Sequence, residues 1–269
     1  MSGWDDPETV AYYEAFCAGH SRYVQANRSL IAHARLEPGM RVLDLAAGTG
    51  RTAEAALPSL GPHGRVVSVE PFTAMRKEGM RRIADDRVAW RATLPHADES
   101  FDRVLCGAAI WQLEPIPETL RSLARLLRVG GALCFNVPAL YLQEPDQPGG
   151  GADPMLLELP ARLIASSDRH PLAQPPAHQA ATPLRRSSVR SFLSAAGLRG
   201  RSWSFRVRVT QDAYGAWLKI PVLTERMLAG LPPMERARRI DLALQSVDRA
   251  SWKWERWRGW TAWKHARFA

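Results

Sequence analysis

The stretch VLDLAAGTGRTAEA, from Val42 to Ala55, decides the fold class. Its first four residues are typical of a buried strand, A-A-G-T-G is typical of a tight glycine turn, and R-T-A-E-A-A begins a helix. Because free backbone N–H groups gather at a helix N-terminus, a strand, a glycine turn and a helix in this order form a nucleotide-binding loop. The stretch therefore predicts a bound nucleotide cofactor and leaves its identity open.

Strands and helices alternate on both sides of this loop. We expect strands at 41–45, 65–70, 87–90, 101–109 and 132–138, and a late pair at 199–209 and 256–268. We expect helices at 7–34, after the loop as far as the break LPSLGPHG (57–64), and at 73–85, 117–131, 188–198, 212–230 and 233–250. This alternation predicts an α/β fold with a Rossmann-like, doubly wound sheet, mostly parallel with an antiparallel last strand.

The chain is expected to form a single domain over 1–269, built from five parts. These are an N-terminal helical cap (1–38), a cofactor-binding core (39–138), two lid or substrate insertions (139–190 and 211–250) and a closing strand (251–269). The first insertion is rich in proline, with eight prolines between residues 143 and 183. At 269 residues the chain is long enough for one full core with such elaborations.

The composition limits the classes of partner. The net charge is +9, but only four of the 36 basic residues are lysines, and the arginines are spread along the whole chain. We therefore expect a diffuse basic surface and no nucleic-acid partner. The N-terminus MSGWDDPETVAYY does not resemble a signal peptide, and no apolar run reaches the roughly 18 residues of a membrane helix. The sequence predicts a soluble, cytoplasmic protein with no membrane partner, and leaves open whether it is a monomer or a dimer.

Two cofactors fit the glycine loop at first. Residues Gly48 to Ala53 satisfy G-x-G-x-x-A and Glu70 lies twenty residues beyond Gly50, which is the dinucleotide fingerprint. Asp44, however, stands at the strand end before the glycines, where its carboxylate would repel a pyrophosphate. A ligand with an ammonium or sulfonium group would instead be attracted. Asp44 thus favours a cationic cofactor over NAD.

Four blocks carry a family resemblance. They are D-x-A-x-G-x-G (Asp44 to Gly50), V-x-V-E ending at Glu70, LPHADESFDRVLCGAAIWQLE and LARLLRVGGALCF. In order and spacing they resemble the class I S-adenosylmethionine-dependent methyltransferases, in the small-molecule branch that includes the ubiquinone and menaquinone methyltransferases. The resemblance covers residues 10–138 well and roughly the last eighty residues loosely.

The resemblance implies S-adenosylmethionine as the cofactor. It implies cofactor contacts from Asp44, Ala46, Gly48, Gly50, Glu70, Pro71, Phe72, Met75, Ala92, Thr93, Leu94 and Ala108. Asp44 would lie near the methionine amine, and Glu70 would accept both ribose hydroxyls. Glycine at 48 and 50 would let the backbone approach the cofactor without a Cβ in the way.

The adenine contacts follow from the same resemblance. Pro71, Phe72 and Met75 would form an apolar wall on one adenine face, with Leu94 opposite. The family often has an aspartate near residue 91 or 92 for the adenine amino group, and this chain has W-R-A-T-L-P there. Adenine recognition would then depend on backbone groups or on Thr93.

Methyl transfer from a sulfonium needs mainly an aligned acceptor and a dry site. Accordingly the sequence shows no catalytic triad, and no two histidines have metal-ligand spacing, so we expect no metal. Asn136 and Tyr13 are the catalytic candidates, and Tyr12, Tyr23, Tyr141 and Tyr214 are the substrate-binding candidates. The segment after the 101–109 strand has neither an N/D/S-P-P-aromatic block nor a Pro-Cys pair, which favours a small-molecule acceptor over a nucleic acid.

A second reaction stays open on the same fold. Enzymes similar to azetidine-2-carboxylate synthases cyclise the aminobutyrate arm of S-adenosylmethionine and release methylthioadenosine, and the aromatic N-terminus and Asn136 fit this alternative too. A dehydrogenase or a non-catalytic binding module fits the residues less well. The arginine- and alanine-rich composition is typical of GC-rich bacterial genomes, in which such enzymes often act in secondary metabolism.

Overall fold

The computed structural model describes residues 3–96, 98–143, 184–225, 228 and 230–266. Contacts group the chain into two compact units. The first comprises Met1–Arg22, Ala152–Thr182 and Arg206–Glu255, and the second Tyr23–Gly151, Pro183–Phe205 and Arg256–Ala269. Most of the expected insertion at 139–190, from 144 to 183, lies outside the described residues.

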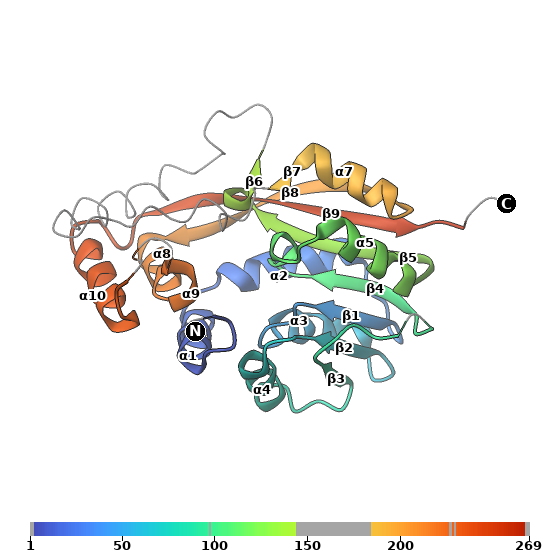
Figure 1. Ribbon diagram of the computed structural model, residues 1–269, viewed down its shortest axis with the longest axis horizontal. Coiled ribbons are helices and arrows are strands. Elements are labelled where there is room, and N and C mark those ends of the chain that lie inside the picture. Colours follow the sequence, from blue (N-terminus) through green and yellow to red (C-terminus); the bar gives the residue numbers. More distant parts are fainter. Residues whose placement is uncertain (1–2, 97, 144–183, 226–227, 229, 267–269) are drawn as a thin grey trace. The chain divides into compact units, whose positions relative to one another are not determined.

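One large sheet dominates the structure (Figure 1). Its strands have the order β3-β2-β1-β4-β5-β9-β8. The strands are β1 (Arg41–Leu45), β2 (Arg65–Val69), β3 (Val88–Arg91), β4 (Phe101–Cys106), β5 (Leu127–Pro138), β8 (Leu198–Thr210) and β9 (Trp252–Lys264). The strands from β1 to β5 are parallel, and β9 runs antiparallel to β5. The predicted Rossmann-like sheet with an antiparallel last strand is thereby confirmed.

Helices cover both faces of the core sheet in the second unit. Leu30 of α2 (Arg22–Ala34) and Leu60 of α3 (Arg51–Leu60) pack on one face, while Leu123 of α5 (Ile116–Leu126) and Leu193 of α7 (Arg186–Ala195) pack on the other. The remaining elements of this unit are α4 (Thr73–Arg82), the 3-10 helices η1 (Ile110–Gln112) and η2 (Ala139–Tyr141), and the short parallel pair β6 (Leu142–Gln143) and β7 (Leu184–Arg185).

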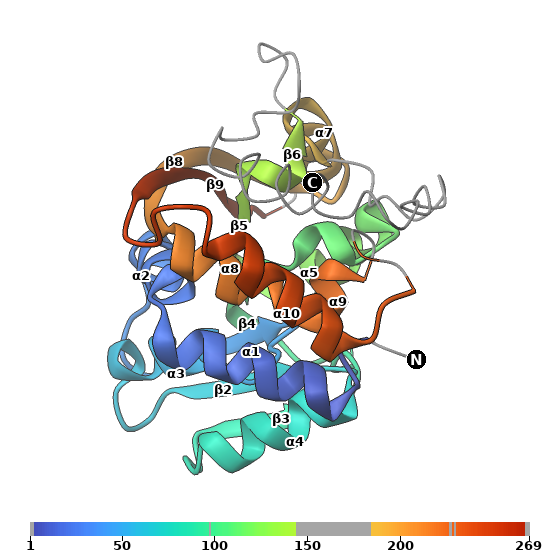
Figure 2. The same cartoon turned by 90° about the vertical axis from the view of Figure 1, so that its left-hand side faces the viewer.

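The first unit is mainly helical and is built around a buried ion pair. It contains α1 (Pro7–Gly19), α8 (Gln211–Leu218), α9 (Pro221–Thr224) and α10 (Pro233–Leu244), which are labelled in Figure 2. The Arg22 guanidinium donates to both carboxylate oxygens of Glu255, at 2.9 and 2.5 Å, and lies 4.4 Å above the ring of Trp217. Across all described residues, no helix is long and apolar enough to cross a bilayer.

Several predicted boundaries were wrong, because tertiary contacts override local propensity. The helix expected over 7–34 is two helices, and His20 between them has an extended backbone. The helix after the glycine loop continues through Pro58, because Leu57 and Leu60 on either side of the proline are buried in the core. The helix expected to end at the glycines ends at Leu126.

The strand β5 begins earlier than expected for a related reason. Leu127 is buried and pairs with Phe101 of β4, so the ladder starts before the two glycines. Gly130 has a positive φ of 78°, and a Cβ on Gly131 would lie 3.1 Å from the carbonyl oxygens of Phe101 and Asp102. The two glycines therefore allow the strand to bend at this point. The expected helices at 212–230 and 233–250 are also shorter, as α8 ends before Pro221 and α10 ends at Leu244.

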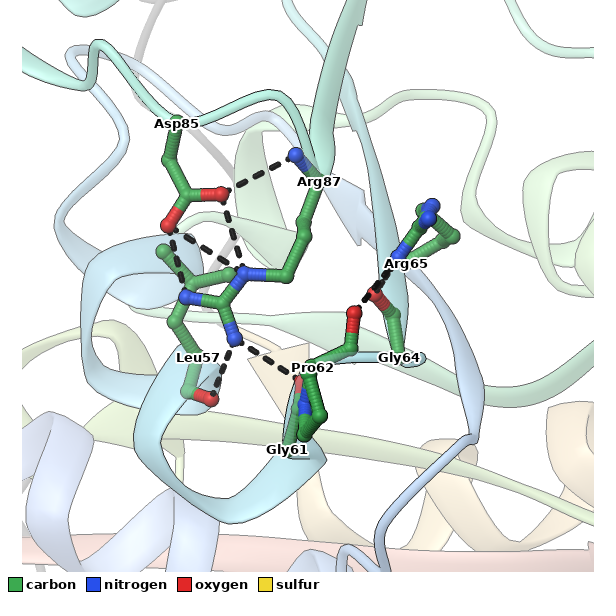
Figure 3. A network of polar contacts seen from close by, with 7 residues as sticks. All are labelled: Leu57, Gly61, Pro62, Gly64, Arg65, Asp85 and Arg87. Carbon is green, nitrogen blue, oxygen red and sulfur yellow. Dashed lines mark hydrogen bonds and ion pairs between the residues drawn. The ribbon is translucent and has the colours of Figure 1, made fainter.

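Arginines fix the turn at the amino end of β2 (Figure 3). The Arg87 guanidinium donates to the carbonyls of Leu57, at 3.4 Å, and Gly61, at 2.9 Å, at the C-terminal end of α3. Asp85 holds this guanidinium through Nε and Nη2, and Arg87 lowers the pKa of Asp85 to about 2. Cations and N–H donors are favourable at a helix C-terminus, where carbonyls lack partners. The opposite end of α3 carries the glycine loop.

Candidate cofactor-binding site

The glycine loop leaves β1 through three residues with left-handed backbones. Their φ angles are 53° at Ala46, 55° at Gly48 and 85° at Gly50. The Ala47 N–H donates to the carbonyl of Val69 in β2 at 3.1 Å, and the Gly50 N–H donates to the Ala47 carbonyl at 2.8 Å. An alanine in this conformation costs about 1–2 kcal/mol, which the glycines avoid. The loop is thus tightly turned and anchored to the neighbouring strand.

The two glycines are needed for different reasons. A Cβ on Gly48 would meet nothing within 4 Å, so this part of the loop leaves room for a close ligand, as the resemblance implies. A Cβ on Gly50 would lie 2.5 Å from Ile83 Cδ1 and 3.0 Å from the ring of Trp90. Packing against Ile83 and Trp90 therefore explains why residue 50 is a glycine. Only at Gly48 does the geometry leave room for the expected close approach of the backbone to the cofactor.

Glu70 directly follows β2 and faces the loop. Its Oε2 accepts a hydrogen bond from the Gly48 N–H at 2.8 Å, and its Oε1 accepts one from the Phe72 N–H at 3.0 Å. On the other side, Arg82 of α4 donates to the Thr49 carbonyl at 2.8 Å. Each carboxylate oxygen can accept more than one hydrogen bond, so Glu70 can hold the loop and still accept hydroxyls.

Asp44 caps the helix that follows the loop. Its Oδ2 accepts a hydrogen bond from the N–H of Ala53, the third residue of α3, at 3.1 Å. The N-cap position is Gly50, which has no side chain to offer. Asp44 therefore supplies from β1 the bond that an N-cap side chain normally makes.

The second oxygen of Asp44 is buried without a partner. Among the described residues, no group hydrogen-bonds to Asp44 Oδ1, and the side chain has no exposed surface. Burial raises the pKa of Asp44 to about 8, the negative charge of Glu70 adds to the rise, and the bond from Ala53 opposes it. A buried carboxylate with an unsatisfied oxygen needs a proton or a cation. The site thus fits the cationic group that the sequence implied.

The sequence analysis missed several residues that shape this site. Ser68 pairs with Asp44 across β1 and β2, and Trp90 of β3 pairs with Ser68. Ser68 Oγ and Trp90 Nε1 are buried polar atoms without a partner among described residues. Arg82 clamps the loop through the Thr49 carbonyl. No local sequence signal marks these side chains, because their roles depend on strand register and on the packing of α4.

The predicted adenine residues follow the ends of β2 and β3. Pro71 and Phe72 are exposed, and so are Ala92 and Thr93. Leu94 is half-buried against the core, whereas Met75 is buried and can only support a wall from within. That these side chains enclose an adenine stays a prediction.

Asn136 is a positioning residue in this structure. Its side chain is fully buried at the carboxyl end of β5, where Nδ2 donates to the Ala26 carbonyl of α2 at 3.0 Å. Its Oδ1 accepts from the N–H of Ala108 at 2.9 Å, and Ala108 has a φ of 53° just beyond β4. Both polar atoms are engaged within the protein. In this structure the side chain ties α2 to the turn after β4, and a catalytic role of Asn136 stays a prediction.

The tyrosine candidates divide between the two units. In the first unit, Tyr12 and Tyr13 lie on α1, and Tyr214 of α8 is buried with its ring 5.7 Å from that of Trp217. In the second unit, Tyr23 lies on α2, and Tyr141 stacks on Trp111 at a centroid distance of 4.5 Å. Their contact with a substrate stays a prediction, and the burial of Tyr214 fits a core residue.

Comparison with known proteins shows which family part of the chain resembles. Residues 43–135 match the family described as a methyltransferase domain. The chain is 31% identical over 113 residues to a demethylmenaquinone methyltransferase from Symbiobacterium thermophilum, covering 39% of this chain and 45% of the relative. Over this part of the chain, the sequence is thus similar to class I S-adenosylmethionine-dependent methyltransferases of the ubiquinone/menaquinone-like branch. This similarity indicates S-adenosylmethionine as the cofactor.

Two further comparisons show how far the similarity extends. A ubiquinone/menaquinone biosynthesis C-methyltransferase, UbiE, from Coxiella burnetii is 33% identical over 121 residues, covering 41% of this chain and 48% of the relative. The match thus spans less than half the length of each curated relative. The YcgJ protein from Bacillus subtilis has the same fold, with a TM-score of 0.57 and 16% identity over 90% of this chain and 99% of that one.

Replacing Asp44 by Asn is expected to stabilise the ligand-free protein. The folded-state pKa of Asp44 is raised from 3.8 to about 8, so its contribution to stability is complete below about pH 4 and is lost as the pH rises towards 8. Asn stays neutral and can still accept from Ala53. In urea unfolding at pH 7, the free energy of unfolding of Asp44→Asn should exceed that of the parent by about 1–3 kcal/mol. This difference in stability should disappear towards pH 4. Equal stability at every pH would contradict this reading of Asp44.

Replacing Glu70 by Ala is expected to weaken binding of S-adenosylmethionine by about 1.5–3 kcal/mol, since hydrogen bonds to a charged group are lost. Isothermal titration calorimetry measures the change. The matched control is Glu118→Ala, which removes an exposed glutamate paired with Arg121 on α5. If Glu70→Ala binds S-adenosylmethionine with unchanged affinity, Glu70 does not contribute to cofactor binding.

Proposed function

We propose that the chain transfers the methyl group of S-adenosylmethionine to a small-molecule acceptor. The observation that supports this most is the pair of carboxylates at the ends of β1 and β2. Asp44 offers a buried oxygen without a partner, and Glu70 offers two oxygens beside Gly48. A single anionic point suits an ammonium or a sulfonium, and a two-oxygen acceptor suits a diol. When bound, the cofactor supplies an activated methyl group on a positively charged sulfur.

The contribution of the chain, in this proposal, is positioning and exclusion of water. Glu70 and Arg82 hold opposite sides of the glycine loop, and Asn136 holds the turn after β4 against α2. Alignment of this kind accounts for much of the acceleration in a reaction whose donor is already activated. Tyr13 remains our candidate for contact with the acceptor.

Several observations favour a small acceptor. The curated relatives are named for ubiquinone or menaquinone biosynthesis, and the turn after β4 reads C-G-A-A-I-W-Q, without the proline pair of enzymes that methylate bases. Because the match covers less than half of those relatives, we do not assign a quinone to this chain. We propose a cytoplasmic enzyme of secondary metabolism, acting on a partly apolar metabolite.

Product analysis tests this proposal and separates it from cyclisation of the cofactor. The purified protein is incubated with S-adenosylmethionine alone and, in parallel, with a small-molecule extract, and the products are read by mass spectrometry. We expect an intact cofactor in the first case and S-adenosylhomocysteine in the second. Glu70→Ala should form less product than the parent at low cofactor concentration. Methylthioadenosine formed from the cofactor alone would contradict methyl transfer.

A further inference from the structure

Most of the net charge of the chain is gathered in one segment. From Leu184 to Gln211 the sequence holds seven arginines and no aspartate or glutamate, in a chain whose net charge is +9. The expectation of a diffuse basic surface is therefore wrong for this part of the molecule. The segment forms β7, α7 and β8, and α7 lies at the β8 side of the sheet in Figure 1.

Part of this segment lines a half-open cavity of about 850 Å³ in the second unit. Its walls come from one face of α7, from the beginning of β8 and from Trp260 of β9. Four arginines contribute to the lining: Arg186, Arg190, Arg199 and Arg201. None of the described residues that line it is acidic. The cavity is thus strongly positive and within the 300–1,000 Å³ of small-molecule sites.

Three of these arginines have no side-chain partner. Arg190, Arg199 and Arg201 are exposed and make no hydrogen bond or ion pair with any described residue. On α4, α5 and α10, by contrast, three exposed arginines each pair with a glutamate three residues earlier, in the pairs Glu78–Arg81, Glu118–Arg121 and Glu235–Arg238. The sequence of α7 offers no such partner.

The cavity is separate from the cofactor loop. It lies at the β8 edge of the sheet, and β4, β5 and β9 stand between β8 and β1, which carries the loop. At about 4.8 Å per strand, the two sites are on the order of 20 Å apart. The floor of the cavity is firm, because a Cβ on Gly200 would lie 2.1 Å from the Thr261 carbonyl oxygen of β9. An occupant of this cavity is therefore a second ligand.

We propose that this cavity binds a small molecule that carries adjacent phosphate groups. Guanidinium groups bind phosphate oxygens in bidentate pairs, and several arginines around one space suit more than one phosphate. The buried Trp260 and Leu193 in the lining offer an apolar wall for the organic part of the ligand.

A recessed site favours such a molecule over a membrane or a nucleic acid. Insertion into lipid and stacking on bases both need exposed apolar or aromatic side chains. The large apolar side chains that the described residues expose are Val24, Phe72, Met80, Val129, Met234, Leu242, Trp252 and Trp254. None of them lines the cavity.

Calorimetric titration with inorganic pyrophosphate and with ADP tests the proposal on the full chain. The test variant is Arg190→Gln/Arg199→Gln/Arg201→Gln. The matched control is Arg81→Gln/Arg121→Gln/Arg238→Gln, which removes the same charge from exposed positions outside the cavity. We expect one saturable site in the parent and in the control, and binding at least about tenfold weaker in the cavity variant. Affinity for S-adenosylmethionine, measured on the same samples, should stay unchanged.

Three results would overturn the proposal. They are no binding of either phosphate compound by the parent, equal weakening in both triple variants, or binding only to anionic vesicles or duplex DNA. Retained cofactor binding in the cavity variant shows that the protein is folded. Because product formation from S-adenosylmethionine is measured separately, failure of this proposal and failure of methyl transfer are distinguishable.

Discussion

The hydrogen bond from the Ala53 N–H to the Asp44 carboxylate joins the end of β1 to the first turn of α3. Everything between these two residues is the cofactor loop, and its left-handed residues keep their conformation because both ends are fixed. The bond also places a carboxylate where water does not reach, with one oxygen unsatisfied. The loop is thus rigid before any ligand binds, at a cost in stability of the free protein.

Side chains from neighbouring elements fix the glycine loop and the turn after β4. Glu70 and Arg82 fix the loop from β2 and α4, and Asn136 fixes the turn after β4 against α2. The glycine-loop end of the sheet is therefore tightly bonded around two carboxyl groups, while the β8 edge carries the arginine-lined cavity. Sites several strands apart suit two ligands without direct competition.

Much of the fold and part of the site follow from the sequence. The order of apolar segments and the glycine loop are enough to predict the sheet, because each depends on residues close in the chain. Asp44 and Glu70 are predictable from sequence because a carboxylate at the end of a buried strand is costly unless it binds a partner. The break at His20 and the early start of β5 at Leu127 depend on tertiary packing, which no local pattern encodes. The hydrogen bond from Asn136 to Ala26 could not be predicted for the same reason, since the two residues are 110 positions apart.

The central claim is that Asp44 is held with an open position that the cationic cofactor completes. Carbon-detected NMR of the Asp44 carboxyl across pH, without and with saturating S-adenosylhomocysteine, measures this directly. The product analogue retains the ammonium group and cannot react. We predict a pKa near 8 in the free protein and a fall of at least about one unit on saturation. A pKa near 4 in the free protein, or one that the ligand does not change, would contradict the account.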